Sequence, residues 1–141
     1  MPATSRTLQH VGEWKLEVCG ATIEELFTEV ARILADAAGP RRPTDTPRAW
    51  ERVELKAPDD ATLLVDWANE LIGRSEVAGR AYGGVRNLVV GSASDGAARL
   101  SADVRGDPVD EWVSPVKAAT YHDAVVAHDG SEWHAVVLLD V

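Results

Sequence analysis

The last ten residues of the chain, from Glu132 to Val141, constrain the fold more than any other segment. They read Glu-Trp-His-Ala-Val-Val-Leu-Leu-Asp-Val and are apolar at both alternating sets of positions. This pattern predicts a strand buried on both faces, in the interior of a sheet. Such a strand would hold the Asp140 carboxylate and the Val141 α-carboxylate side by side, as half of a site for a hard cation. The alternative is a solvated end, which is usual for chain termini.

The composition is that of an ordinary globular protein with an acidic balance. The 141 residues fit a single domain, 1–141, and are 45% hydrophobic and 26% charged. The formal net charge is −9, and no basic run or stripe is visible. We therefore expect no direct nucleic-acid binding, and instead a cation or a basic protein as partner.

Targeting signals are not visible in the sequence. No apolar run approaches the ~20 residues of a membrane span, and the N-terminus lacks the apolar core of a signal peptide. A single cysteine, Cys19, rules out an internal disulfide. We expect a cytoplasmic protein without membrane contact, and the sequence leaves homo-oligomerisation open.

The first half of the chain predicts two strand–helix units. Alternation over 14–18 predicts a strand that ends at Gly20, and Thr22 with Glu25 forms a capping box for a helix that Gly39-Pro40 terminates. After a proline-rich loop at 40–47, alternation over 53–57 predicts a second strand. Pro58-Asp59-Asp60 then begins a second amphipathic helix, which we expect to end near Gly73 and to bury Trp67.

The second half predicts strands. The segment 74–84 is ambiguous between a loop and a further helical turn. Strands are expected at 85–90 and 99–105, joined by a turn at Ser94-Asp95-Gly96, and at 116–127 and 132–141, joined at Asp129-Gly130. Two main amphipathic helices and about six strands, in a mostly antiparallel or mixed sheet, predict an α+β domain.

Two groups of polar residues are candidates for function. Asp66, Asn69 and Glu70 share one face of the second helix, where two carboxylates repel each other unless a cation or partner binds. The alternative is the solvated side of an amphipathic helix. Lys117 and His122 lie on or beside a later strand, and His122 faces away from Lys117 unless a bulge intervenes.

The sequence contains no recognisable reactive centre. It has no nucleophile elbow, phosphate loop, metalloprotease helix or paired-cysteine zinc motif, and its four histidines lack metal-ligand spacing. This argues against an enzyme. A hydrolase that uses Asp66, Glu70 and His122 as acid and base is the remaining catalytic alternative.

Three segments together resemble the archease family. They are Val116-Lys-Ala-Ala-Thr-Tyr-His122 followed by Trp133-His-Ala-Val-Val-Leu-Leu-Asp-Val141, then Leu63-Leu-Val-Asp-Trp-Ala-Asn-Glu-Leu71, and finally His10-Val-Gly-Glu-Trp14. The last stands where the family usually has His-Thr-Ala-Asp and an apolar residue. The likeness spans nearly the whole chain in the right order.

The resemblance implies a small cytoplasmic accessory protein that is not an enzyme. Archeases activate the GTP-dependent RtcB-type RNA ligase of tRNA splicing and RNA repair, by promoting its guanylylation and multiple turnover. Family members hold a divalent metal ion, so the implied ligands are Glu13, Asp140 and Val141. Calcium is the expected ion, with Mg²⁺ and Mn²⁺ as alternatives. The residues Asp66, Asn69, Glu70, Lys117 and His122 are candidates for ligase contact or for support of the metal site.

This chain also departs from the family pattern. Glu13 replaces the usual Asp and lengthens that ligand by one methylene, Val11-Gly12 replaces Thr-Ala, and Ser114-Pro115 interrupts the approach to Lys117. These changes leave a second hypothesis open. In it, the protein is a metal-independent chaperone or adaptor that keeps the fold but has lost the metal site.

Overall fold

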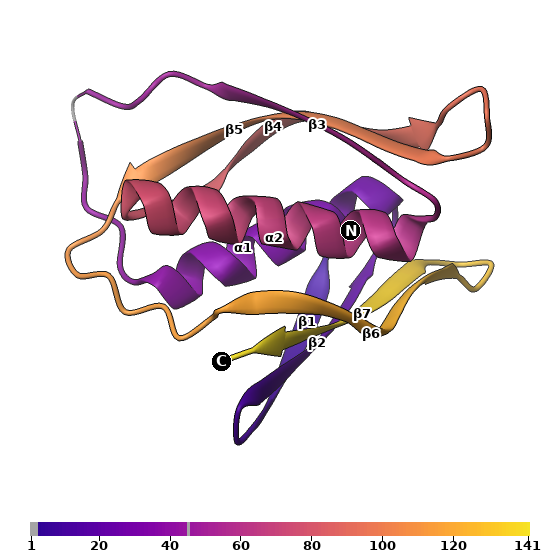
Figure 1. Ribbon diagram of the computed structural model, residues 1–141, viewed down its shortest axis with the longest axis horizontal. Helices are drawn as coiled ribbons and strands as arrows, with labels where there is room; N and C mark the ends of the chain where they lie inside the picture. The colour runs from indigo at the N-terminus through magenta and orange to yellow at the C-terminus, as the bar shows by residue number, and fades with distance from the viewer. Residues whose placement is uncertain (1–2, 45) are drawn as a thin grey trace.

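Two helices lie between two antiparallel sheets, so the protein has three layers (Figure 1). The computed structural model describes residues 3–44 and 46–141. The helices are α1 (Ile23–Ala38) and α2 (Asp60–Ala78). The strands are β1 (Thr4–His10), β2 (Glu13–Gly20), β3 (Glu51–Ala57), β4 (Arg80–Ser92), β5 (Ala98–Pro108), β6 (Ala118–His128) and β7 (Trp133–Asp140). The four-stranded sheet has the order β1-β2-β7-β6 and the three-stranded sheet the order β3-β5-β4. The prediction of an α+β fold is confirmed, and neither described helix is long and apolar enough to cross a membrane.

Strand β7 occupies the predicted interior position, between β2 and β6. Its inward side chains Ala135, Val137 and Leu139 are buried, whereas Val136 and Leu138 on the other face are only half-buried. The prediction of burial on both faces was therefore wrong. The helices cover only one side of this sheet, and the apolar residues on its other side are partly open to solvent.

Helix α1 begins and ends where its capping residues predict. The Thr22 hydroxyl accepts from the Glu25 N–H at 3.2 Å, and the Glu25 carboxylate accepts from the Thr22 N–H at 2.9 Å. Gly39 ends the helix with φ 131°, and a Cβ there would lie 2.5 Å from the Glu111 carbonyl oxygen. A side chain is therefore excluded at Gly39 by both conformation and space.

Helix α2 is longer than the sequence predicts. Asp59 caps it by accepting from the Thr62 N–H at 2.7 Å, but the helix continues past Gly73 to Ala78, and β4 follows at once. The left-handed Gly79, with φ 63°, is the residue that ends it. Gly73 is tolerated because its cost of about 1 kcal/mol relative to Ala is offset by packing and ion pairs on both sides of it.

The strands of the two predicted hairpins are confirmed with shifted limits. Strands β4 and β5 extend beyond 85–90 and 99–105, and Gly96 with φ 85° forms the turn between them. Strand β6 begins at Ala118 rather than 116, and the Asp129 carboxylate shapes the turn before β7 by accepting from the Glu132 N–H at 3.0 Å.

Strand β1 was not predicted and raises the number of strands in the described residues from about six to seven. Only Leu8 of this strand is half-buried, and the others are exposed. The strand therefore lacks the alternation that identifies strands from sequence. It is held by pairing with β2 and by the Ser5 hydroxyl, which donates to the Glu29 carboxylate of α1 at 2.7 Å.

The core lies between the sheets and centres on Trp67, which is fully buried as predicted. Its indole Nε1–H donates to the Phe27 carbonyl oxygen at 2.9 Å, and the two rings lie 6.5 Å apart. The indole thus joins α2 to α1 with its one polar atom satisfied. Both sheets pack on this shared layer of helices.

Candidate functional site

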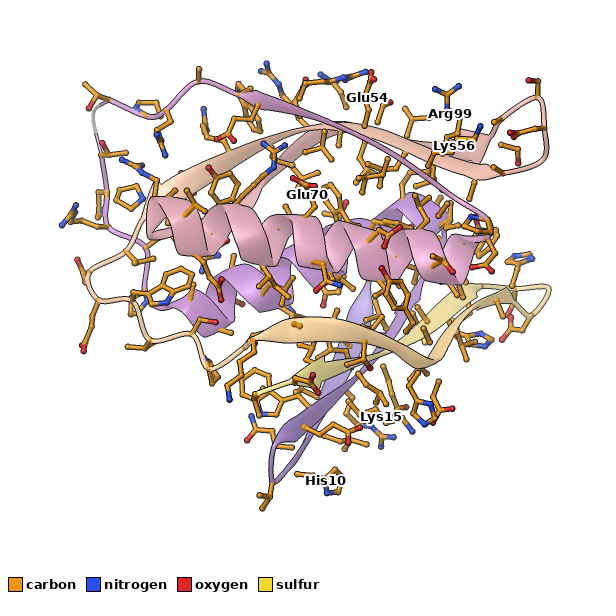
Figure 2. All side chains as sticks on the ribbon, viewed as in Figure 1. His10, Lys15, Glu54, Lys56, Glu70 and Arg99 are labelled. Atoms are coloured by element: carbon orange, nitrogen blue, oxygen red, sulfur yellow. The ribbon has the colours of Figure 1, made fainter. Side chains whose placement is uncertain are left out.

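The candidate metal site lies at the end of the four-stranded sheet where the β1–β2 hairpin turns. Gly12, with φ 77°, forms this tight turn, and β2 begins directly after it. Glu13 pairs in register with Asp140 of β7, and His10 of β1 pairs with Glu13. Directly opposed residues of antiparallel strands point to the same side of the sheet, so the two carboxylates share its outer face. Figure 2 shows Lys15 and His10 on that side, away from the helices.

The main chain on both sides of Asp140 is fixed by hydrogen bonds. The Val141 N–H donates to the Gly12 carbonyl oxygen at 3.2 Å, and the Lys117 N–H donates to the Asp140 carbonyl oxygen at 2.8 Å. The Val141 side chain packs against the core. The structure therefore brings together the three residues that the resemblance implied as ligands, with Val141 beside the hairpin turn.

The donor chemistry of this end of the sheet fits a hard cation. Glu13 is half-buried and Asp140 exposed, and among the described residues no ion pair compensates either carboxylate. Within residues 3–44 and 46–141, no three His, Cys, Asp or Glu side chains gather closely enough to hold a metal ion. A cation here would therefore take two carboxylates and complete its oxygen ligands from main-chain oxygens of Val141 and from water.

Asn69, one of the three polar candidates on α2, has a structural role. Its side-chain N–H donates to the Ala119 carbonyl oxygen at 3.0 Å, and its oxygen accepts from the Ala119 N–H at 2.8 Å. The amide thus satisfies both polar groups of one residue on the open edge of β6 and joins α2 to the four-stranded sheet.

Asp66 lies one turn earlier on the same helix and contacts the same strand. It accepts a hydrogen bond from the Tyr121 hydroxyl, and this bond raises the pKa of that phenol. Tyr121 belongs to a bulge in β6 between Thr120 and Val125, in which Asp123 has φ 56°. The sequence left open whether a bulge breaks the alternation of this strand, and the structure contains one.

Glu70 faces a different neighbourhood, between α2 and the three-stranded sheet (Figure 2). It accepts from Arg74 at 2.7 Å, and Arg74 also donates to Glu51 of β3 at 2.8 Å. The Tyr82 hydroxyl donates to Glu51 at 2.7 Å. The pKa of Tyr82 is raised mainly by burial and, to a smaller extent, by this hydrogen bond. These groups line a cleft of about 780 Å³, together with Arg48.

The expectation that the α2 carboxylates repel each other unless a cation or partner binds was therefore wrong for Glu70, because Arg74 of the same helix compensates its charge. Arg74, at i+4, was visible in the sequence as its partner. The contacts between Glu51, Arg74 and Tyr82 had no local signal, because β3, α2 and β4 meet only in the fold.

The remaining two candidates are exposed and do not join this cluster. Lys117 lies beside the metal-site end, through its main-chain bond to Asp140. His122 is 80% exposed and lies 3.2 Å from Asp123. Among the described residues, no hydrogen bond or ion pair connects any two of Asp66, Glu70 and His122. The geometry gives the hydrolase alternative no support.

Known proteins share this fold. The solution structure of protein 1598 from Methanobacterium thermoautotrophicum superimposes with a TM-score of 0.76 at 20% identity, covering 97% of this chain and 98% of that one. A crystal structure from Thermotoga maritima, described as an archease and possible chaperone, gives a TM-score of 0.55 at 21% identity, with 96% of each chain covered.

Sequence comparison extends this likeness to curated relatives. The protein archease of Thermococcus gammatolerans is 31% identical over 119 residues, 82% of each chain. That of Methanosarcina barkeri is 27% identical over 140 residues, covering 95% of this chain and 93% of the relative. The model of the Archease protein family (MTH1598/TM1083) matches residues 6–141. The chain therefore belongs to the archease family.

Proposed function

We propose that this protein is a non-catalytic accessory factor that activates a GTP-dependent RtcB-type RNA ligase in the cytoplasm. It would promote guanylylation of the ligase and thereby allow the ligase to turn over more than once. Family membership supports an accessory role. The structural observation that supports the use of a metal ion is the direct pairing of Glu13 with Asp140 across β2 and β7. The pair places two uncompensated carboxylates at a surface end of the sheet.

Such a pair is costly without a function. Two carboxylates directly opposite each other on neighbouring strands repel and destabilise the sheet. A bound divalent cation would remove this repulsion and present positive charge at the same end of the sheet. Glu13, Asp140 and main-chain oxygens of Val141 would hold the ion, and an all-oxygen set favours Ca²⁺, with Mg²⁺ or Mn²⁺ as alternatives.

The neighbouring exposed groups are suited to contact the ligase. Lys117 adjoins Asp140 through the main chain. Tyr121 lies on the same strand as His122 and donates a hydrogen bond to Asp66 of α2. Asn69 holds α2 against that strand, so its place in the proposal is to position Asp66 and Tyr121. Glu70 would act at most indirectly, since its carboxylate is paired with Arg74.

The proposal is tested by ligase guanylylation. The cognate RtcB-type ligase is incubated with GTP and divalent metal, and formation of the covalent guanylate adduct and of ligated RNA is followed over several turnovers. Wild-type protein should stimulate both, whereas Glu13→Gln combined with Asp140→Asn should not. Asp110→Asn combined with Glu111→Gln removes the same charge from exposed residues elsewhere and should stimulate like wild type. Failure of the wild-type protein to stimulate the ligase would refute the proposal.

Charge reversal separates the contact surface from the metal site. Lys117→Glu and Asp66→Lys should reduce stimulation while leaving the calcium affinity close to that of wild type, because neither side chain is a proposed ligand. Lys117 is exposed, so the melting temperature of Lys117→Glu should change little, whereas Asp66→Lys also loses the hydrogen bond from Tyr121 and should lower it modestly. Full stimulation by both variants would mean that this surface is only a solvated face.

The adaptor alternative rests on a different observation. The end of β7 is anchored by two main-chain hydrogen bonds, Val141–Gly12 and Lys117–Asp140, that need no ligand side chain. If the Glu13→Gln and Asp140→Asn double variant stimulates the ligase as well as wild type, the protein acts as a metal-independent adaptor of the same fold.

A further inference from the structure

Cationic side chains gather on the outer face of the three-stranded sheet. Alternation along β3 and β5 buries one set of residues against the helices and turns the other set outward. The outward set and its neighbours on β4 define the basic face: Arg52, Lys56, Arg86, Arg99 and Arg105. Figure 2 shows Lys56, Arg99 and Glu54 on the side of this sheet that faces away from the helices.

One row of residues across the three strands, Lys56, Arg99 and Gly91, is not explained by a contribution to the stability of the sheet. Lys56 of β3 pairs in register with Arg99 of β5, and Arg99 pairs with Gly91 of β4. Like charges directly opposite each other destabilise a sheet. Lys56 contacts Asp95 of the turn at 2.7 Å, but no carboxylate of the described residues lies within ion-pair distance of Arg99. Because Gly91 has no side chain, the row opens into a hollow of about 400 Å³.

The opposite end of the face holds two guanidinium groups in place. Arg86 and Arg105 each lie 4.3 Å from the ring centroid of Trp50. Stacking on an aromatic ring orients a guanidinium group and leaves the N–H donors at its open edge for a ligand. The Nε atom of Arg105 is itself buried, so only the terminal nitrogens of that group can serve. Between the two ends, Asp103 contacts Arg52 at 3.5 Å and Arg86 at 3.4 Å, so part of the charge is compensated.

The charge of the face contrasts with that of the chain. Five cations stand against the outward carboxylates Glu54, Asp103 and Asp107 and the turn residue Asp95, in a protein of formal net charge −9. An anionic polymer would therefore be repelled by most of the surface and attracted to this side. Four of the five cations are arginines, whose planar donors match phosphate oxygens.

We propose that the basic face binds single-stranded RNA through its phosphates. An acidic protein is the less suitable partner, because protein interfaces centre on buried apolar anchors. On this face Val89 is the exposed large apolar side chain, and Trp50 is stacked with arginines. The sequence led us to expect no direct nucleic-acid binding because it has no basic run. The cations of the face are scattered from residue 52 to residue 105 and meet only in the sheet.

Binding of this kind has two consequences. Because the proposed contacts are to phosphates, affinity should depend weakly on sequence and strongly on salt. The slope of log K against log salt concentration should be about −0.7 per neutralised phosphate for a single strand. The face also lies on the other sheet from Glu13 and Asp140, so RNA binding does not depend on the proposed ligase role.

The test is RNA binding by the full chain alone. Fluorescence anisotropy follows a labelled oligouridylate of about 12 nucleotides, a length within the usual site size of single-strand binding folds. Titrations run between about 50 and 200 mM salt. Lys56→Gln combined with Arg99→Gln should weaken binding by about tenfold or more and flatten the salt slope by about 1.4. Glu54→Gln should instead tighten binding. Lys15→Gln combined with Arg42→Gln removes the same charge elsewhere and should bind like wild type.

Other results would overturn the proposal. No binding by wild type at the lowest salt would do so, as would equal weakening in the control pair. If the face variant binds RNA like wild type but loses ligase stimulation, the face contacts a protein instead. Thermal melts check the folding of each variant. Arg99→Gln should keep or raise the melting temperature, because it removes a like-charge pair.

Discussion

The two sheets pack on the same pair of helices, yet their solvent-facing sides differ in the charged residues that they carry. The outer face of the four-stranded sheet mixes apolar and paired charged residues and ends in the carboxylates of Glu13 and Asp140. The outer face of the three-stranded sheet carries five cations. The inner faces of both sheets are mostly apolar. The exceptions include Glu51 of β3 and Ser5 of β1, which bond to side chains of α2 and α1. The shared core therefore dictates the inner positions only, and the fold does not require the charge difference outside.

We therefore expect the outer faces of the sheets to serve binding, and the helices between the sheets to determine stability. Variants of the helices should weaken the whole molecule or one sheet, whereas variants of the outer faces should change binding at little cost in stability. The predictions below test this division, beginning with the variant of largest expected effect.

Trp67→Ala should be the most damaging single change. It removes a fully buried indole between the sheets and should lower the free energy of unfolding by about 3–5 kcal/mol, through lost burial and a cavity. Trp67→Phe keeps most of the bulk but loses the bond to the Phe27 carbonyl, so it should cost less. Denaturant unfolding measures both, and a Trp67→Ala loss below that of Trp67→Phe would contradict the proposed core.

Asn69→Ala should affect one sheet selectively. It leaves the Ala119 N–H and carbonyl without their side-chain partner and should cost about 2 kcal/mol. Asn69→Asp keeps the acceptor but places a carboxylate oxygen against the Ala119 carbonyl oxygen, so it should cost at least as much as Asn69→Ala. Hydrogen exchange should increase in β6 before β5. Uniform loss of protection in both strands would show that the sheets do not respond separately.

Glu29→Gln should have the smallest effect of these variants on the free energy of unfolding, and that effect should depend on pH. The Arg32 guanidinium, with the Ser5 hydroxyl, holds the pKa of Glu29 below its ordinary value. The ionised form therefore stabilises the folded state above the unfolded pKa of about 4.3, and this stabilisation is lost as the pH falls through the folded pKa. At neutral pH the variant should lose about 1 kcal/mol, because Arg32 is half exposed and solvent screens the pair.

Thermal melts of this variant and wild type from neutral pH to about pH 3 measure that difference. It should shrink as the solution becomes acidic. Glu76→Gln, an exposed change on α2, serves as the control and should follow wild type at every pH. A difference between Glu29→Gln and wild type that is constant across the range would contradict the assigned role of the carboxylate.

The sequence predicted features that depend on local chemistry. Thr22 with Glu25 and Gly39 marked both ends of α1, and alternation marked β2, β3 and β5. The end of α2 at Gly73 was wrong because the glycine signal was local, while Arg74 and Ile72 gain contacts with distant strands. Strand β1 was missed because its stability comes from pairing with β2.

Of the candidate site, the register of Glu13 with Asp140 agrees with the residues that the family resemblance implied. The role of Asn69 was not predictable, because its partner lies 50 residues away. The basic face was missed for the same reason, since a linear scan detects runs of charge and not rows across strands.

Calcium calorimetry on the isolated protein tests the central claim most directly. Titration into wild type should show one site, and Glu13→Gln or Asp140→Asn should weaken it by about tenfold or more, through loss of a charged ligand. Glu111→Gln, an exposed change elsewhere, should not weaken it. If the Glu13→Gln and Asp140→Asn double variant binds calcium as tightly as wild type, the site is not at this end of the sheet.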